Sequence, residues 1–241
     1  MHRCFVPVHF LNMKKYYISA LTLLFSYFAY ADQGGIYLDA TRVVFDSSMS
    51  SAKVKLNNKT ESNWLLRAWV TQYGLKDKSN EFIITPPLYK IGPNESFQFR
   101  IENLDKSLPD DRESVFHVNV MTIPPIARED KNKNNVVQFS VNNRIKLFYR
   151  PSKINNARQV LDAYKRLTAS PSKNSVIISN PTPYYITMDD VKINGKDVKS
   201  INDFMVAPYS TLTIPEKNAK TLSYTAINDY GGKLPGINIV F

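Results

Sequence analysis

The stretch VVQFSVNNRIKLFYRP, residues 136–151, alternates apolar and polar side chains over most of its length. From the second residue onward, one apolar row is interrupted only by Asn143 and consists of Val137, Phe139, Val141, Ile145, Leu147 and Tyr149. A two-residue period predicts a β-strand with one apolar face. The period holds for about 14 residues, or roughly 45 Å, whereas strands usually have three to ten residues. A small sandwich cannot cover so long a face, so the sequence leaves open what the overhanging part packs against.

Most of the chain after residue 34 also predicts short strands, each bounded by Pro, Gly, Asn or Asp. The first group consists of the opening stretch and residues 35–46, 51–58, 63–74, 82–93, 96–103 and 114–123. The second group consists of residues 175–180, 184–195, 203–214, 222–229 and 236–241. This spacing predicts an all-β fold of two immunoglobulin-like β-sandwich domains, residues 32–153 and 154–241.

Three local signals refine this organisation. Asn194-Gly195 predicts a hairpin turn. Residues 156–167 predict one short helix, because four apolar side chains have helical spacing there, namely Val160, Leu161, Tyr164 and Leu167. The segment IAREDKNKNN, residues 126–135, is too polar to build a core and predicts a mobile loop from which the long strand emerges.

The first 31 residues have the features of a secretory signal peptide. Met13, Lys14 and Lys15 form a basic region, residues 18–28 are mostly apolar, and Ala-Tyr-Ala at 29–31 predicts a cleavage site. A membrane anchor is the alternative, but the apolar run is shorter than the roughly 20 residues that a membrane span needs. Because residues 1–12 have no role in such a signal, our hypothesis is that translation starts at Met13.

Cleavage after residue 31 would change the available chemistry. It would remove Cys4 and leave a chain without a thiol, so no disulfide is expected although export would permit one. It would also remove three of the basic residues, which lowers the net charge from +10 to +7. Because an exported protein rarely meets nucleic acid, this charge indicates either an anionic protein or peptide partner or a merely solvated basic surface.

The sequence does not favour an enzyme. A mature chain with His117 as its one histidine and no cysteine offers no His/Cys metal cluster, and neither a G-x-S-x-G nucleophile motif nor a glycine-rich phosphate loop occurs. The acidic pairs Asp110-Asp111 and Asp189-Asp190 would point to opposite faces of a strand, so solvated turns are the better interpretation. We therefore expect no catalytic residue, metal or cofactor, and a structural role for His117.

Six motifs, in order along the mature chain, resemble those of the periplasmic chaperones of the chaperone-usher pathway, which escort fimbrial subunits. They are LDATRVVFD (38–46), ITPPLYKIGP (84–93), LPDDRESVFHVNVMTIPP (108–125), NNRIKLFYRP (142–151), NPTPYYIT (180–187) and INDYGG (227–232). The resemblance implies two immunoglobulin-like domains in an L or boomerang arrangement. It also implies that the long strand is donated to a fimbrial (pilus) subunit that lacks one strand, with Val137, Phe139 and Val141 filling the subunit's groove.

The resemblance also assigns roles to charged residues. Arg42 and Lys146 match the family's anchor for the C-terminal carboxylate of the subunit, and a group of three matches its interdomain charge cluster, namely Glu113, Arg150 and Asp229. The implied partners are fimbrial subunits and an outer-membrane usher, and the free form would be able to self-associate through its exposed strand. Because no cysteine pair is present, we favour the short-loop group of the family.

Two other functions are alternatives to a chaperone. A fimbrial subunit or adhesin would have one incomplete sandwich and an N-terminal donor extension, and a secreted sandwich hydrolase would have a cluster of catalytic carboxylates or a metal site. Neither set of features is visible in the sequence.

Overall fold

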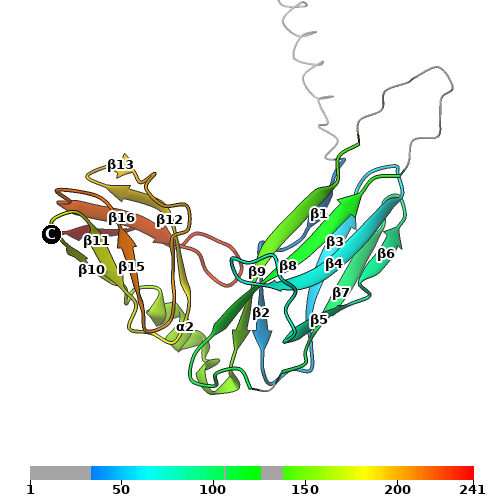
Figure 1. Cartoon of the computed structure of the whole chain (residues 1–241), viewed down its shortest axis with the longest axis horizontal. Coiled ribbons are helices and arrows are strands. Elements are labelled where there is room, and N and C mark those ends of the chain that lie inside the picture. The colour runs from blue at the N-terminus through cyan, green and yellow to red at the C-terminus, as the bar shows by residue number, and fades with distance from the viewer. Residues whose placement is uncertain (1–33, 106, 126–137) are drawn as a thin grey trace, which may run out of the picture. The chain divides into compact units, whose positions relative to one another are not determined.

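The computed structural model describes residues 34–105, 107–125 and 138–241, and most of its regular structure is β-strand (Figure 1). The predicted signal peptide, Val137 and the predicted loop 126–135 lie outside the described residues. Among the residues that are described, no helix is long and apolar enough to span a membrane.

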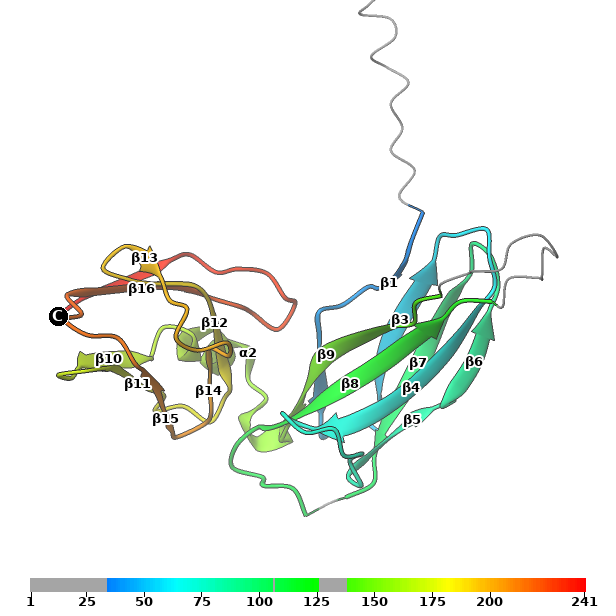
Figure 2. The same ribbon diagram turned by 45° about the horizontal axis from the view of Figure 1, so that its top comes forward.

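Strands β1 to β9 form two sheets, which we call the first sandwich (Figures 1 and 2). One sheet has the strand order β1-β3-β7-β5 and the other has the order β2-β9-β8-β4-β6. The strands are β1 Ile36–Leu38, β2 Arg42–Asp46, β3 Ala52–Asn58, β4 Trp64–Gln72, β5 Phe82–Thr85, β6 Leu88–Ile91, β7 Ser96–Asn103, β8 Ser114–Ile123 and β9 Val141–Arg150. Side chains of both sheets meet in one core, where Leu56, Phe99 and Leu147 have no exposed surface.

Two segments that the sequence predicts as single strands are each divided between the sheets of the first sandwich. Residues 35–46 form β1, which pairs with β3, and β2, which pairs in parallel with β9. Residues 82–93 form β5 and β6, which lie in different sheets. Pro86 and Pro87 separate β5 from β6, and proline interrupts a strand ladder because it has no N–H to donate.

Strands β10 to β17 form two further sheets, the second sandwich, with the orders β10-β11-β15 and β13-β12-β16-β17, and β14 also pairs with β12. The strands are β10 Thr168–Pro171, β11 Val176–Ser179, β12 Ile186–Ile193, β13 Lys196–Asp197, β14 Met205–Val206, β15 Thr211–Ile214, β16 Thr221–Ala226 and β17 Ile237–Val240. The predicted hairpin at Asn194-Gly195 joins β12 to β13, and both residues have positive φ, 52° and 76°. Strand β10 was not predicted.

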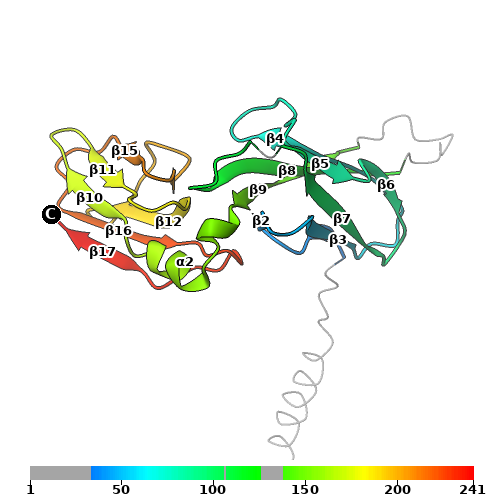
Figure 3. The same cartoon turned by 90° about the horizontal axis from the view of Figure 1, so that it is seen from below.

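The predicted helix is present but shorter than its pattern. After a 3-10 turn at Ser152–Ile154, α2 covers Ala157–Ala163 and lies against the second sandwich (Figure 3). The side chain of Asn156 caps the N-terminus of the helix by accepting hydrogen bonds from the backbone N–H groups of Arg158 and Gln159. Of the apolar residues that predicted the helix, Val160 is buried, whereas Leu161 is 56% exposed.

The interpretation of Asp189 and Asp190 as a solvated turn is wrong. Both residues lie in β12, where the register against β16 shifts between Asp189 and Lys192. Asp190 adopts a positive φ of 51° at this bulge, so the usual alternation is lost. Both carboxylates therefore reach Lys233, at 3.2 and 2.7 Å, as an exposed ion-pair group.

Strand β9 changes environment along its length. The strand begins at Val141 and has 10 residues, so it is shorter than the predicted alternation of about 14. Leu147 is completely buried, whereas Val141 is 55% exposed, and Phe139, which precedes the strand in the same apolar row, is 75% exposed. Pairing with β8 covers residues 141–149, but pairing with β2 begins only at Lys146. In the described part of the chain, residues 141–145 therefore have a strand neighbour on one side only.

This difference predicts unequal losses of stability when two side chains of one row are truncated. Leu147→Ala should lower the free energy of unfolding by about 2–5 kcal/mol because it leaves a cavity in the core. Phe139→Ala should change it by less than about 0.5 kcal/mol because the ring is already in water. Urea unfolding followed by tryptophan fluorescence measures this directly, since both tryptophans, Trp64 and Trp69, lie in β4 of the first sandwich. Equal losses in the two variants would show that Phe139 belongs to the core.

Candidate functional site

The register of β9 brings the two predicted anchor cations together. Arg42, the first residue of β2, is the parallel partner of Lys146 in β9. Arg42 Nη1 donates to Ile227 O at 3.3 Å, and the guanidinium lies 5.9 Å from the centre of the Phe148 ring. Its Nε is buried and has no hydrogen-bond partner among the described residues. Because the guanidinium is partly desolvated, burial lowers the pKa of Arg42. Its Nε–H remains available to donate a hydrogen bond to another group.

The ammonium group of Lys146 contacts two side chains. Its Nζ lies 3.6 Å from Asp203 Oδ1 and 5.7 Å from the centre of the Tyr73 ring. The Tyr73 hydroxyl donates a hydrogen bond to the other oxygen of Asp203, and its ring stacks on His117 with centres 4.6 Å apart. Burial lowers the pKa of Lys146, the nearby Arg42 lowers it further, and Asp203 acts in the opposite direction. The site is thus a pair of crowded cations with one counter-charge at the lysine.

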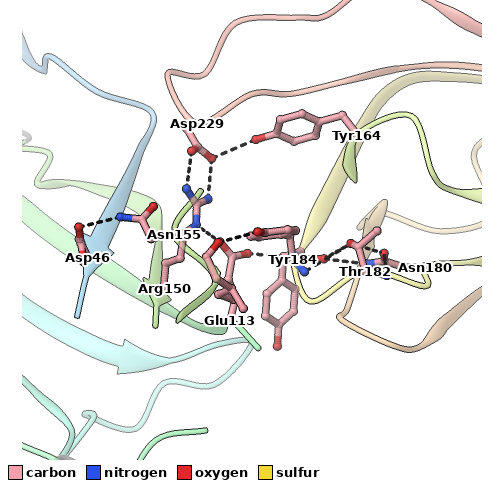
Figure 4. A network of polar contacts seen from close by, with 11 residues as sticks. Asp46, Glu113, Arg150, Asn155, Tyr164, Asn180, Thr182, Tyr184 and Asp229 are labelled. Carbon is pink, nitrogen blue, oxygen red and sulfur yellow. Dashed lines mark hydrogen bonds and ion pairs between the residues drawn. The ribbon is translucent and has the colours of Figure 1, made fainter. Parts of the chain in front are cut away.

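The three residues predicted as an interdomain charge cluster are in direct contact (Figure 4). Arg150 Nε donates to Glu113 Oε1 at 2.7 Å, while Nη1 and Nη2 donate to the two oxygens of Asp229 at 2.7 and 2.9 Å. The second oxygen of Glu113 accepts from the backbone N–H of Tyr185 at 2.8 Å. Tyr164 donates to Asp229 at 3.0 Å. Residues of both sandwiches therefore contribute to this group, which we call the Arg150 network.

The turn at residues 227–232 aims Asp229 at Arg150. The side chain of Asn228 accepts from the backbone N–H groups of Tyr230 and Gly232, both at 2.9 Å. Gly231 has a φ of 82°, and a Cβ there would lie 2.1 Å from Thr41 Oγ1. A larger residue would therefore collide with the segment before β2. The same turn supplies the Ile227 carbonyl that binds Arg42, so it holds two cations of the site.

Protonation in the Arg150 network is set by burial and by charge. Burial raises the pKa of Asp229, but the hydrogen bonds and charge of Arg150 outweigh it and hold the pKa below its ordinary value. Glu113 is almost completely inaccessible, and burial raises its pKa despite Arg150. Burial lowers the pKa of Arg150, yet its two acidic partners raise it overall.

The exposed half of β9 is held by polar contacts in place of a core. Asn119 in β8 is completely buried, and its Oδ1 accepts from Asn142 Nδ2 at 3.2 Å and from Arg144 Nε at 2.9 Å. Thr122 Oγ1 donates to the carbonyl of Val141 at 3.2 Å. These bonds keep the strand extended while its apolar row faces water.

The structure thus brings Arg42 to Lys146 and joins Glu113 to Arg150 and Asp229. It also exposes Val141, the first residue of β9, and Phe139, which precedes this strand. The sequence missed four residues that contact these groups, namely Tyr73, Asn119, Tyr164 and Asp203. Their contacts join positions far apart in the chain, so no local pattern marks them. The described residues contain no group of three or more His, Cys, Asp or Glu side chains able to hold a metal ion.

Comparison with known proteins identifies the family. Residues 35–155 match the N-terminal domain of PapD, a pili and flagellar-assembly chaperone, and residues 162–237 match the C-terminal domain of the pili assembly chaperone PapD. The chaperone protein LpfB of Salmonella typhimurium is 34% identical over 202 residues, which are 82% of this chain and 85% of LpfB. The chain therefore belongs to the PapD family of pilus-assembly chaperones, a periplasmic and non-enzymatic family.

Solved structures agree with the fold. The Escherichia coli chaperone DraB superimposes with a TM-score of 0.74 at 30% identity, over 86% of this chain and 98% of DraB. A chain in the complex of the Salmonella enterica SafA pilin with the SafB chaperone has the same fold, with a TM-score of 0.76 at 24% identity over 86% and 96% of the two chains. The predicted all-β fold of two immunoglobulin-like sandwiches is confirmed, and the adhesin and hydrolase alternatives are not supported.

The Arg150 network predicts a pH-dependent contribution to stability. Asp229→Asn should lower the free energy of unfolding by about 1–3 kcal/mol at neutral pH, because it removes charge-assisted bonds to a buried guanidinium. Since the folded-state pKa of Asp229 is lowered, its contribution is complete above the ordinary aspartate pKa of about 3.9 and is lost as the pH falls through the folded-state value. Calorimetric unfolding of wild type and Asp229→Asn, from neutral pH to pH values below about 3.9, measures how the difference in their free energies of unfolding changes.

The matched control is Asp197→Asn, which breaks an exposed pair with Lys192 at 3.8 Å and should cost almost nothing at any pH. A difference between wild type and Asp229→Asn that does not shrink as the pH falls below about 3.9 would contradict the assignment.

Proposed function

We propose that this chain is exported through a cleaved signal peptide and binds fimbrial subunits in the periplasm by donating β9 to their incomplete sandwich. The observation that carries the proposal is the change along one apolar row, which runs from the buried Leu147 to the exposed Val141 in β9 and continues to the exposed Phe139 before this strand. A row of this kind is half of a core, and an open groove in a second sandwich would supply the other half. Val137 would extend the row by one more position.

The backbone of β9 supports the same proposal. Residues 141–145 pair with β8 on one side, and the opposite edge is where a partner strand would add. Each apolar side chain buried in the partner's groove would contribute on the order of 1.5–3 kcal/mol before ordering costs are subtracted. Covering the groove would also prevent the subunit from aggregating edge to edge.

The carboxylate anchor would set the register of this pairing. Arg42 and Lys146 lie beside the point where the free edge of β9 begins, and they repel each other in a partly desolvated place. A terminal carboxylate would relieve this repulsion and accept charge-assisted hydrogen bonds from both cations. Because one fixed point fixes a whole ladder, the anchor would select one register among several.

The Arg150 network would hold the two sandwiches in one orientation around the bound subunit. Its role would be orientation more than stability, because desolvation offsets most of the attraction in a buried ion pair. The chaperone would then deliver its subunit to an outer-membrane usher. Without a subunit, the exposed strand would be free to pair with a second copy.

The first test is co-expression of the chain with the fimbrial subunit encoded beside it, followed by purification from the periplasm. Wild type should yield a one-to-one complex, while Lys146→Ala and Arg42→Ala should fold normally and lose nearly all of it. Lys192→Ala is the matched control, because this lysine is an exposed strand residue whose ion pair, with Asp197, is also exposed. Normal recovery of the complex in both anchor variants would refute the carboxylate anchor.

A second test concerns the donated row. Phe139→Asp should reduce the yield of complex at least tenfold, because it would place an unpaired charge in an apolar groove, while chaperone stability should not change. Val240→Asp is the control, since Val240 is 80% exposed on β17 of the second sandwich. The donated-strand assignment fails if Phe139→Asp binds the subunit as well as Val240→Asp does.

A further inference from the structure

The lysine of the proposed anchor already holds a carboxylate in the free chain. Asp203, which lies between β13 and β14 of the second sandwich, contacts Lys146 Nζ at 3.6 Å and accepts a hydrogen bond from the Tyr73 hydroxyl. Asp203 is the only acidic residue that pairs with Lys146 in the part of the chain that the structure describes. It therefore occupies the chemical position that a partner's terminal carboxylate would need.

We propose that Asp203 is an internal competitor for the carboxylate site of Lys146, and that the incoming carboxylate displaces it and takes over both of its partners, Lys146 and Tyr73. This inference rests on the proposed function, because it assumes that Lys146 binds a carboxylate. It adds Tyr73 to the site as a third donor beside Arg42 and Lys146.

Charge favours displacement over shared binding. Arg42 and Lys146 are neighbours, and Asp203 neutralises one of these two cations. If Asp203 stayed, the incoming group would place a second carboxylate beside it at the same ammonium, and the two negative charges would repel each other. If Asp203 leaves, the number of charges at the lysine does not change.

The geometry of Asp203 is that of a replaceable partner. The distance of 3.6 Å exceeds the roughly 2.7–2.9 Å of a charge-assisted hydrogen bond, and the Asp203 side chain is 51% exposed. Asp229, the other acid of the second sandwich that reaches a cation of the first, forms two bonds of 2.7 and 2.9 Å and is 28% exposed. Asp203 would return to water at little cost, whereas Asp229 would not.

Tyr73 is suited to remain in place when Asp203 leaves. Its ring stacks on His117 at an interplanar angle of 22°, and the ring face lies 5.7 Å from the Lys146 ammonium. These contacts do not involve Asp203, so the ring would keep its position and continue to attract the cation. The hydroxyl would then donate to the incoming carboxylate in place of Asp203.

The experiment measures binding of two labelled nonapeptides that alternate valine and threonine and differ only at the C-terminus, which is a free carboxylate or an amide. Fluorescence anisotropy is recorded with wild type, Asp203→Asn and the control Asp197→Asn. Asp203→Asn should bind the carboxylate peptide about three- to tenfold more tightly, as expected for loss of one competing, half-exposed ion pair. Its affinity for the amide should not change, and Asp197→Asn should resemble wild type with both peptides.

Tyr73→Phe, made in the Asp203→Asn background, tests the third donor. It should weaken binding of the carboxylate peptide by about threefold or more and leave the amide unaffected, because only the carboxylate accepts from the hydroxyl. If the carboxylate peptide binds Asp203→Asn with the same affinity before and after Tyr73→Phe is added, Tyr73 is not part of the site.

The remaining outcomes separate this inference from the proposed function. If the carboxylate peptide binds wild type better than the amide does, but Asp203→Asn binds it equally or more weakly than wild type, the anchor stands and Asp203 is not a competitor. If wild type does not distinguish the two peptides, or binds neither, the anchor itself fails and the competitor fails with it. Asp203→Ser, which lacks the amide of asparagine, should repeat the result of Asp203→Asn.

Discussion

The register of β9 between β2 and β8 is the constraint on which the rest of the structure depends. A β-strand has two faces, and a shift by one residue would exchange them. In the observed register Leu147 enters the core, and the apolar row continues from it to Val141 and Phe139. The opposite face carries Lys146 and Arg150, so one strand supplies both an apolar row and two cations.

Those two cations differ in how firmly their acids are held. Arg150 is almost completely buried, and its acidic partners accept three bonds of 2.7 to 2.9 Å, so removing either acid would break charge-assisted bonds to a buried guanidinium. Lys146, four residues earlier on the same face, has one long contact with a half-exposed carboxylate. The strand thus carries one cation that ties the two sandwiches together and another whose partner is exchangeable. The turn at residues 227–232 serves both ends of this arrangement, because Ile227 binds Arg42 and Asp229 binds Arg150.

Local patterns explain what the sequence predicts well and where it fails. The two-residue period of β9 predicts the two faces of that strand. Asn194-Gly195 predicts the hairpin between β12 and β13, and helical spacing predicts α2. Residues 35–46 cross from one sheet to the other, and the apolar residues that face the core change from Ile36 and Leu38 in β1 to Val43 and Phe45 in β2. The prediction of a single strand missed this change of phase. Asp203 and Tyr73 lie 130 positions apart and meet only because both sandwiches have formed, and neither residue interrupts or marks a local pattern. The matched motifs, by contrast, lead to Glu113, Arg150 and Asp229, whose contact no periodicity would predict.

An exposed apolar row beside a free strand edge is also a risk, because such edges pair readily with other chains. The chain counters this risk with polar groups at the same place. Asn143 interrupts the apolar row between Val141 and Ile145, and Arg144, on the opposite face, is fixed by Asn119 next to Lys146. A second copy pairing with this edge would bring its own Arg144 and Lys146 toward these cations, whereas a partner strand that ends in a carboxylate would bring the opposite charge. The same cations would therefore favour such a partner over a second copy, so the specificity of the edge would come from charge and its affinity from the apolar row.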